Sequence, residues 1–453
     1  MENLGHTNDS STAPVSNFAI GSALLGIGIL IFSFFYLFVK QKGKSTTEES
    51  DQKPNAPDHK PSQPTLIPQS KIVKPDTFKF THPWLCASLR GHAKDVTGLD
   101  FSHNDKYLAS TGRDEKVFLW QVKEFESRDH RNTQCNVELG GALNVKFSPD
   151  GRAFLINLIN ENIIRAYKFA KRDDGLPKDI KQVLDFSKKH EREIIAIGIA
   201  SSGKFIMSAS ADTKIIIWDT KGEVLSSLET HQGHLNHASV SPCGRFFGSS
   251  GFTPDARFFE VCFDKTTGNF KEVRKAFDLK GHNASVLYFS LNKDSTRAAT
   301  LSKDKTWKLY NTDVDYVHKQ DAKCLYTGTF DKINMIKTGL IALSPDALSC
   351  VIAIDSNLYF YNLGGTEKIC EQEIVDVHSE SICSMIFDST GKYLATAGDR
   401  QIRIFYNVAN LKAMIDELSE KSKVTKQLSL KERIDEQIMD AREQLNKILN
   451  RTQ

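Results

Sequence analysis

The chain has 453 residues, of which 40% are hydrophobic and 25% charged, enough for one large folded domain with appendages. Its formal net charge of +3 is too small to argue for bulk nucleic-acid binding. The 8 cysteines include no C-x-x-C pair and no zinc-ligand spacing with histidine. A disulfide framework and a zinc module are therefore disfavoured, and we expect reduced thiols.

The first element predicted in chain order is a transmembrane helix over residues 18–39. This stretch contains no charged residue, and a helix of its length crosses a bilayer at ~1.5 Å rise per residue. A cleaved signal peptide fits poorly, because residues 1–17 contain no Lys or Arg and no small-residue cleavage site follows the apolar stretch. Lysines at 40, 42 and 44 come directly after it. The positive-inside rule then predicts a lumenal segment 1–17 and a cytosolic remainder.

Residues 40–78 are predicted to form a flexible tether. They hold prolines at 54, 57, 61, 64, 68 and 75 among polar residues, with few large apolar side chains. Such a stretch buries too little apolar surface to fold and should act as a semi-extended spacer. The next domain would then stay near the membrane and remain free to reorient.

An internal repeat fills residues 79–407. Its members share a His, a Ser or Thr, an Asp and an aromatic residue at steps of 18, 4 and 6 residues. The three full copies, called structural tetrads below, are His92, Ser110, Asp114 and Trp120; His190, Ser208, Asp212 and Trp218; and His282, Thr300, Asp304 and Tyr310. A fourth copy keeps His378, Thr396 and Tyr406, with Arg400 at the Asp position and Asp399 one residue early.

Short strands and turns surround each tetrad. Apolar residues alternate with a spacing of two, as at Leu99 and Phe101, and turn residues such as Asn104-Asp105 follow. A unit of about 40–50 residues with several short strands is typical of a propeller blade. Three degenerate copies complete the set of seven predicted blades, and their candidate polar residues are Glu161 in one, His231 or His234 with Asp255 in another, and Asp355 in the third.

The tetrads are predicted to be structural. A buried indole needs an acceptor, and a hydroxyl can accept that bond and donate onward to a histidine. The histidine can then donate to the aspartate, which also needs turn N–H groups when it is buried. The same residue types suggest Ser-His-Asp catalytic triads, but an active site is normally built once, whereas this set recurs in three blades. We therefore expect no catalytic residue.

Three dipeptides, Gly91-His92, Gly281-His282 and Trp218-Asp219, resemble the signatures of the WD-repeat family. The resemblance implies an all-β fold, a seven-bladed WD-repeat β-propeller in which the network is structural. The segment from Trp84 to Arg90 precedes the first Gly-His as Phe277 to Lys280 precedes Gly281. It is predicted to be the outer strand of the last blade, which closes the ring and removes an exposed sheet edge.

Residues 408–453 are predicted to form a short helical tail. Leu411, Met414, Ile415 and Leu418 suggest one helix. In a second helix, Ser429 to Glu432 reads as a capping box. One face of that helix carries the apolar residues Leu430, Ile434, Ile438, Ala441, Leu445 and Ile448. Such a stripe must be buried, either against the propeller or against a partner helix or short coiled coil.

The order of these parts resembles that of membrane-anchored, transducin beta-like members of the WD-repeat family. The run from Ser241 to Asp255 carries this resemblance most closely. The resemblance implies a single-pass protein of the endoplasmic reticulum membrane with a cytosolic propeller. It also implies a role in the unfolded protein response, with a phosphorylated kinase of the PERK type among the protein partners.

The predicted function is a non-enzymatic scaffold for protein–protein interaction. Loops on the tetrad side of the ring should carry partner binding. Their basic residues form a candidate rim for a phosphorylated or acidic segment, the alternative being an ordinary solvated surface: Arg113, Lys116, Lys214, Lys303, Lys305 and Arg400. No metal, cofactor, small-molecule substrate or sequence-specific nucleic acid is expected.

Two other functions stay open from the sequence. One is a nucleotide-exchange factor for a small coat GTPase, although such propellers carry their anchor after the propeller, whereas here the apolar segment comes first. The other is a lumenal propeller hydrolase, which needs inward carboxylates and amides on a central metal. The repeat frame shows no such cluster.

Overall fold

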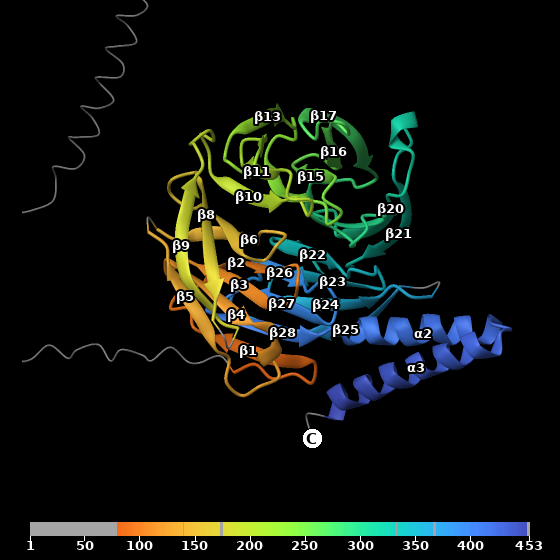
Figure 1. Cartoon of the computed structure of the whole chain (residues 1–453). Coiled ribbons are helices and arrows are strands. Elements are labelled where there is room, and N and C mark those ends of the chain that lie inside the picture. The colour runs from red at the N-terminus through yellow and green to blue at the C-terminus, as the bar shows by residue number, and fades with distance from the viewer. Residues whose placement is uncertain (1–78, 139, 173–174, 332, 366–367, 451–453) are drawn as a thin grey trace, which may run out of the picture. The chain divides into compact units, whose positions relative to one another are not determined.

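The computed structural model describes residues 79–138, 140–172, 175–331, 333–365 and 368–450. Across these ranges the strands form seven four-stranded antiparallel sheets, arranged as the blades of a propeller (Figure 1). The predicted seven blades are thus confirmed. The predicted segments 1–17, 18–39 and 40–78 lie outside the described residues. Among the helices that are described, none is long and apolar enough to traverse a bilayer.

In blades 1 to 6 the chain runs from an inner strand at the ring axis to an outer strand. The strands of blades 1 to 3 are β2 (Val96–Phe101), β3 (Tyr107–Gly112), β4 (Lys116–Gln121), β5 (Asn132–Asn136), β6 (Ala142–Phe147), β7 (Ala153–Leu158), β8 (Ile164–Lys171), β9 (Pro177–Asp185), β10 (Ile194–Ile199), β11 (Ile206–Ser210), β12 (Lys214–Trp218) and β13 (Val224–Glu229). Those of blades 4 to 6 are β14 (Leu235–Val240), β15 (Phe246–Gly251), β16 (Ala256–Phe263), β17 (Phe270–Leu279), β18 (Val286–Leu291), β19 (Arg297–Ser302), β20 (Thr306–Asn311), β21 (Lys323–Thr329), β22 (Gly339–Leu343), β23 (Ser349–Ile354), β24 (Asn357–Asn362) and β25 (Ile369–Ile374). Short 3-10 helices, η1 (Val122–Glu124) and η2 (Tyr316–His318), precede the outer strands of blades 1 and 5.

Blade 7 closes the ring. It contains β26 (Ser384–Phe387), β27 (Tyr393–Ala397), β28 (Gln401–Tyr406) and, as its outer strand, β1 (Leu85–Arg90). Strand β1 pairs antiparallel with β28, so the predicted closure by residues 84–90 is confirmed. A further bond joins blades 7 and 1, because Ser389 N donates to Asp105 Oδ1 at 2.8 Å.

Hydrophobic cores lie between neighbouring blades. Val117 and Leu119 of blade 1 pack with Val145, Phe147 and Ile156 of blade 2. Successive side chains of a strand point to opposite faces of its sheet, and a blade between two others must bury both. The sequence of β12, KIIIW, is buried from its second residue to its last for this reason. Each blade therefore depends on its neighbours for stability, and the ring is rigid.

The tail forms a helical hairpin beside blades 6 and 7, made of α2 (Val408–Val424) and α3 (Leu428–Leu449) (Figure 1). The two predicted helices are confirmed. The start of α2 is buried at Val408 and Ala409, and Ile448 near the end of α3 packs into the same apolar cluster as the strands of blade 7. The end of the hairpin next to the propeller is therefore docked on it.

Two details of the predicted tail are wrong. Ser429 does not cap α3, because the helix begins at Leu428 with Gln427 in the N-cap position and no side-chain capping bond. Residues 425–427 separate the two helices, and Ser429 already lies inside α3. Leu430 is 44% exposed, although Ile434, Ile438 and others of the predicted stripe are buried.

Candidate functional site

The candidate site is one end of the ring, which we call the loop face. It carries the turns between the second and third strands of each blade and the connections from one blade's outer strand to the next blade's inner strand. Both lie at the same end because neighbouring strands are antiparallel. Backbone bonds join these loops across blades, as when Val96 N donates to Asp399 O at 3.0 Å and Ile382 N to Asp355 O at 2.8 Å. Loops of neighbouring blades thus hold one another in place.

Blade 1 contains a closed polar network beneath this face. His92 Nδ1 donates to Asp114 Oδ1 at 2.9 Å, and Ser110 Oγ donates to His92 Nε2 at 2.9 Å. The Trp120 indole donates to Ser110 Oγ at 3.0 Å, and Ala93 N donates to the other carboxylate oxygen of Asp114 at 2.8 Å. Burial lowers the pKa of His92, and the bond to Asp114 opposes that shift. The four side chains satisfy one another, as a structural network requires.

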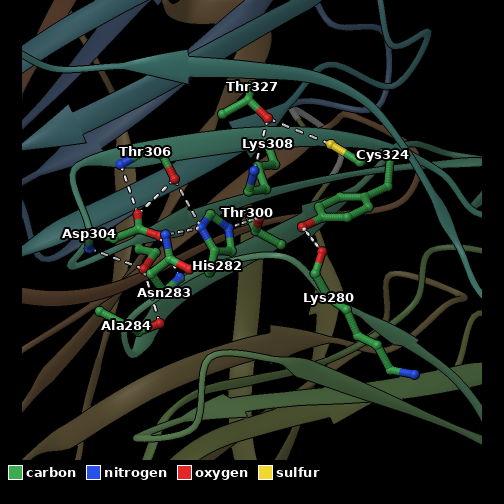
Figure 2. Close-up of polar contacts among 12 residues, drawn as sticks. Lys280, His282, Asn283, Ala284, Thr300, Asp304, Thr306, Lys308, Cys324 and Thr327 are labelled. Atoms are coloured by element: carbon green, nitrogen blue, oxygen red, sulfur yellow. Dashed lines mark hydrogen bonds and ion pairs between the residues drawn. The ribbon is translucent and has the colours of Figure 1, made fainter.

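Blade 5 builds the same network around a threonine (Figure 2). The imidazole of His282 lies 2.7 Å from Thr300 Oγ1 and 3.1 Å from Asp304 Oδ2. Asp304 also accepts from Asn283 N at 2.9 Å and from Thr306 Oγ1 at 2.7 Å. Burial alone would raise the pKa of Asp304, but these bonds outweigh burial and lower it. The carboxylate is therefore held in its charged form.

The tyrosine of blade 5 has a different role from the tryptophan of blade 1. A phenol carries its oxygen at the far end of the ring, and the hydroxyl of Tyr310 donates to the carbonyl oxygen of Lys280 at 2.9 Å. This bond ties the third strand to the connection that enters the blade. Tyr310 is fully buried.

Blade 3 does not close its predicted tetrad. Trp218 donates to Ser208 Oγ at 2.8 Å, and His190 Nε2 lies 2.7 Å from the same hydroxyl. His190 Nδ1, however, has no hydrogen-bond partner among the described residues, and Asp212 is exposed. Burial without a bonded carboxylate lowers the pKa of His190 to about 4. The expected contact between His190 and Asp212 is therefore wrong.

Blade 3 differs from blades 1 and 5 at two positions beside the tetrad. Thr213, next to Asp212, has a φ of 79°; Glu115 and Lys305 at the same place in blades 1 and 5 also have a positive φ, of 60° and 65°, but neither is β-branched. Glu191 follows His190, whereas Ala93 and Asn283 stand at that position in blades 1 and 5. A carboxylate at position 191 adds a like charge to this loop, which favours exposure of Asp212.

Blade 7 uses a buried arginine. Arg403 has no exposed surface, and its guanidinium lies 2.6 Å from His378 Nδ1 and 3.0 Å from Asp399 Oδ2. His378 Nε2 lies 3.0 Å from Thr396 Oγ1. Burial favours the neutral form of Asp399, but bonds from His378, Gln401 N and Arg403 hold its pKa below the ordinary value. Asp399 thus takes the role that the spacing assigned to position 400, and Arg400 is exposed.

Blade 4 replaces the histidine by a glutamine that sequence reasoning missed. Gln232 is fully buried; its Oε1 accepts from Ser249 Oγ at 2.6 Å, and its Nε2 donates to Asp255 O at 3.1 Å. The predicted alternatives, His231 and His234, are both exposed. The tetrad spacing did not identify Gln232, because it lies 17 residues before Ser249, whereas the tetrad histidines lie 18 residues before their hydroxyl residue. A pattern that allows Gln or Asn as well as His at 17 or 18 residues before the serine includes Gln232.

The six predicted rim residues lie at the loop face in blades 1, 3, 5 and 7, and they do not form one cluster. Backbone bonds place Arg113 and Arg400 near each other, because Arg113 N donates to Asp95 O and Val96 N to Asp399 O, both at 3.0 Å. Lys303 and Lys305 flank Asp304 in blade 5, and Lys116 and Lys214 begin the third strands of blades 1 and 3. Arg113, Lys303 and Arg400 are exposed, and the other three are half-buried.

Phe252 is a further residue of this face that the sequence did not single out. It lies in the turn between β15 and β16 of blade 4 and is 76% exposed. The turn is held rigidly, since Phe252 N donates to Gln232 O at 3.0 Å and to His234 O at 2.9 Å. A Cβ on the preceding Gly251 would lie 2.3 Å from His234 O, so only glycine allows this path. The phenyl ring is exposed on blade 4, and Lys214 and Lys303 belong to the adjacent blades 3 and 5.

The centre of the ring is a channel of about 1120 Å³ lined by the inner strands of all seven blades. Two contacts between its side chains are close: Lys146 Nζ lies 2.7 Å from Asp100 Oδ1, and the ring of His237 stacks on Tyr288 with centroids 3.6 Å apart. Burial lowers the pKa of His237 to about 3, so its ring is neutral. Over the described ranges, no group of three or more His, Cys, Asp or Glu side chains is placed to hold a metal ion.

Comparison with known proteins matches the WD40 family, described as WD domain, G-beta repeat. The matched segments are residues 84–121, 181–219, 273–311 and 370–405. They end in or directly after the third strands of blades 1, 3, 5 and 7. These are the four blades in which a histidine network was recognised from the sequence.

Individual proteins are also similar over much of the chain. Transducin beta-like protein 2 from Mus musculus is 44% identical over 375 residues, which cover 83% of this chain and 84% of that protein. Its counterpart from Homo sapiens is 44% identical over 375 residues, covering 83% of each. A guanine nucleotide-binding protein subunit beta-like protein from Encephalitozoon cuniculi is 26% identical over 247 residues, covering 49% of this chain and 71% of that protein.

Proposed function

This chain belongs to the family of transducin beta-like protein 2, a group of WD-repeat proteins, and on that premise we propose that it is a non-enzymatic scaffold anchored in the endoplasmic reticulum membrane. WD propellers generally serve as platforms for protein–protein interaction. Beyond that general role, we propose the membrane that holds the chain, the face of the propeller that binds, and the chemistry of the bound partner.

The loop face is the surface that carries the proposal. Its turns rest on buried networks such as that of His92 and Asp114, so they are presented in one conformation and lose little entropy on binding. Phe252 is the large aromatic side chain exposed there, at 76%. A rigid exposed aromatic flanked by cations is typical of a binding hot spot. Lys214 and Lys303 lie on the neighbouring blades.

The proposed partner is a phosphorylated or acidic protein segment that also presents an apolar side chain. Phosphate and carboxylate oxygens form charge-assisted hydrogen bonds with guanidinium and ammonium groups. Resemblance to membrane-anchored relatives favours a kinase of the PERK type and a role in the unfolded protein response. The exposed acids Asp95, Glu115 and Glu380 interrupt the basic residues, which would restrict where such a segment can lie.

Capture of a phosphorylated PERK cytosolic domain by the full chain tests this proposal. Reversal of three charges, Arg113→Glu with Lys303→Glu and Lys305→Glu, should weaken capture by roughly tenfold or more. Phe252→Ala should weaken it by a similar factor, because truncating a hot-spot aromatic costs about 2 kcal/mol. Phosphatase treatment of the partner should act in the same direction as the charge reversal.

The matched control reverses three exposed cations on the opposite face, Lys106→Glu, Arg152→Glu and Lys293→Glu. These lie in or beside turns between first and second strands, and the control changes the net charge by the same amount. Val183→Ala, on an outer strand, is the control for Phe252. Equal capture by the rim variants, the controls and the unaltered chain would end the proposal.

The membrane location has its own test. The apolar residues 18–39, followed by lysines, support an anchor with a cytosolic propeller. Asn283-Ala-Ser285 is an N-glycosylation sequon, and Asn283 is exposed. We expect the chain to resist alkaline extraction from microsomes and Asn283 to carry no glycan. A glycosidase-sensitive mass that disappears in Asn283→Gln would place the propeller in the lumen instead.

A further inference from the structure

The turn of the C-terminal hairpin is an exposed apolar and basic surface that the loop face does not use. It joins α2 to α3 through residues 425–427. Val424 is 79% exposed, Leu428 is 72% exposed and Leu430 is 44% exposed. Single exposed apolar residues are ordinary, but three within seven residues form a patch that marks an interaction site. We call residues 421–431 the hairpin tip.

The hairpin tip is also strongly basic. It contains Lys421, Lys423, Lys426 and Lys431, all exposed, and no acidic residue. Lys421 and Lys423 lie within 4 Å of Glu417 and Glu420 on α2, at 2.5 and 2.7 Å. Lys426 and Lys431 form no ion pair with any residue that the structure describes. At least two positive charges thus stand uncompensated beside the apolar side chains.

The tip is held away from the propeller by a stiff base. Lys412 Nζ lies 2.7 Å from Glu371 Oε2 of blade 6, and Asn410 Nδ2 donates to Asp346 Oδ2 at 2.8 Å. Ser422 Oγ donates to Asp435 Oδ1 at 2.7 Å and joins the two helices just before the turn. Figure 1 shows the hairpin extending outward from blades 6 and 7, with its turn farthest from the sheets. The surface is therefore convex and projecting.

From these observations we infer that the hairpin tip inserts into the interface of an anionic membrane. Apolar side chains that enter the boundary between headgroups and acyl chains, together with lysines that attract anionic lipids, are the two components of interfacial binding. A protein partner fits the tip less well. A stable protein interface buries about 800 Å² on each side, and three side chains at a convex turn offer little of that area.

This contact goes beyond the proposed anchor, because it lies at the other end of the chain and would set the orientation of the propeller. An anchor followed by a long tether limits how far the propeller can lie from the membrane but does not set its orientation. A second contact through α2 and α3, which are docked on blades 6 and 7, would fix which way the loop face points. The proposal does not depend on how residues 1–78 meet the membrane.

Fluorescence quenching by brominated phosphatidylcholine tests the contact on the full chain. The four native tryptophans, Trp84, Trp120, Trp218 and Trp307, are all buried, so lipid cannot quench them by contact. Leu428→Trp adds a reporter at the tip, and Met439→Trp adds one at a 70% exposed apolar position of α3. The two positions are about 16 Å apart along the helix.

In vesicles that contain phosphatidylserine as well as the brominated lipid, we expect quenching in Leu428→Trp and little in Met439→Trp. Vesicles without phosphatidylserine should quench less. Adding Lys426→Gln and Lys431→Gln should lower the membrane-bound population of the tip roughly thirtyfold relative to the free one, since each lysine near an anionic surface contributes about a fivefold factor.

Equal quenching at the two reporter positions overturns the inference. Quenching that depends neither on phosphatidylserine nor on Lys426 and Lys431 overturns it as well. Absence of quenching at the tip in every vesicle also overturns it and leaves a protein as the occupant. Alkaline extraction of the same vesicles reports separately whether the chain is anchored, because it removes a protein held only by an interfacial contact and leaves a transmembrane helix in place. A chain that is extracted at alkaline pH but shows tip quenching at neutral pH refutes the anchor alone.

Discussion

Blades 1 and 3 carry the same four residue types at the same spacings, yet only blade 1 closes its network. His92 is bonded on both ring nitrogens, whereas His190 Nδ1 has no partner in the part of the chain that the structure describes, and Asp212 is exposed. Outside the signature, blade 3 differs by a β-branched residue, Thr213, at the position of positive φ and by Glu191 next to the histidine. The four tetrad residues are thus not sufficient for a closed network, and residues next to them in the sequence also affect whether it forms.

Blade 4 is the converse case. It lacks the histidine, yet Gln232 lies buried at the entry to the blade and bonds to the hydroxyl of Ser249 in the second strand. What recurs around the ring is therefore a role: a buried polar side chain that ties the entering loop to a strand hydroxyl. A role that different residue types can fill is expected for a structural support and not for catalysis.

Removal of the arginine of blade 7 should break this support most severely. Arg403→Ala leaves Asp399 buried without its cation, so we expect the free energy of unfolding to fall by about 3–5 kcal/mol. Urea unfolding followed by tryptophan fluorescence measures the change. The neighbouring Arg400 is exposed, and Arg400→Ala should change stability by less than about 0.5 kcal/mol. Similar losses in both variants would contradict the assigned role of Arg403.

The open network of blade 3 should appear as a pH dependence. Burial lowers the pKa of His190 from 6.5 to about 4. Between these values the unfolded chain binds a proton that the folded chain does not, so stability is complete above pH 6.5 and is lost as the pH falls toward 4. The full shift corresponds to at most about 3 kcal/mol.

His190→Gln should reduce this dependence between pH 7 and 5, because a glutamine amide does not titrate, whereas His237, whose pKa burial lowers to about 3, continues to contribute. Urea unfolding at the two pH values measures it. The exposed His103 provides the control, and His103→Gln should leave the dependence as it is. A slope that survives His190→Gln unchanged would assign the acid sensitivity to other groups.

Blades 1 and 4 should differ in their response to loss of the central serine. Ser110→Ala leaves both His92 Nε2 and the Trp120 indole without a partner, and we expect a loss of about 2–3 kcal/mol. Ser249→Ala leaves one oxygen of Gln232 unpaired, and the loss should be about 1 kcal/mol. Thermal and urea unfolding of the two variants would compare them. Equal losses would show that the networks are not built as described.

The smallest predicted effect separates blades 1 and 3 at the aspartate. Asp114→Ala removes bonds to His92 and to Ala93 N and should cost about 1–2 kcal/mol. Asp212→Ala should change stability by less than about 0.5 kcal/mol, because Asp212 is exposed and bonds only to a nearby backbone N–H. A comparable loss at Asp212 would mean that it reaches His190 in solution.

Most of the fold could be predicted because it repeats. The period of the apolar positions located the blades, and the likeness of Trp84–Arg90 to Phe277–Lys280 identified the closing strand. The contents of each network could not be read in the same way. Gln232 was missed because it lies 17 residues before its serine and not 18. The exposure of Asp212 could not be predicted, because Asp114 and Asp304 occupy the same place in the repeat, are also followed by a residue of positive φ, and are not exposed.

The surface was predicted only in part for a similar reason. Topology alone assigns Arg113 and Lys303 to the loop face, since any turn between second and third strands must lie there. The exposure of Phe252 depends on the path of one turn, which a glycine at 251 allows. The exposure of Val424 and Leu428 depends on how few residues join α2 to α3. Neither follows from hydrophobic periodicity.

The central claim is that buried networks support the ring while the loop face binds, and partner affinity measured on two folded variants tests it most directly. Ser110→Ala keeps the bonds of Asp114 to His92 and to Ala93 N, which fix the turn. At about 20 °C, where this variant should remain folded, it should therefore bind the phosphorylated partner as tightly as the unaltered chain, although it unfolds more easily. The variant with Arg113→Glu, Lys303→Glu and Lys305→Glu should unfold as the unaltered chain does and bind weakly. Loss of binding in a folded Ser110→Ala chain, with full binding in the charge-reversed chain, would contradict the account.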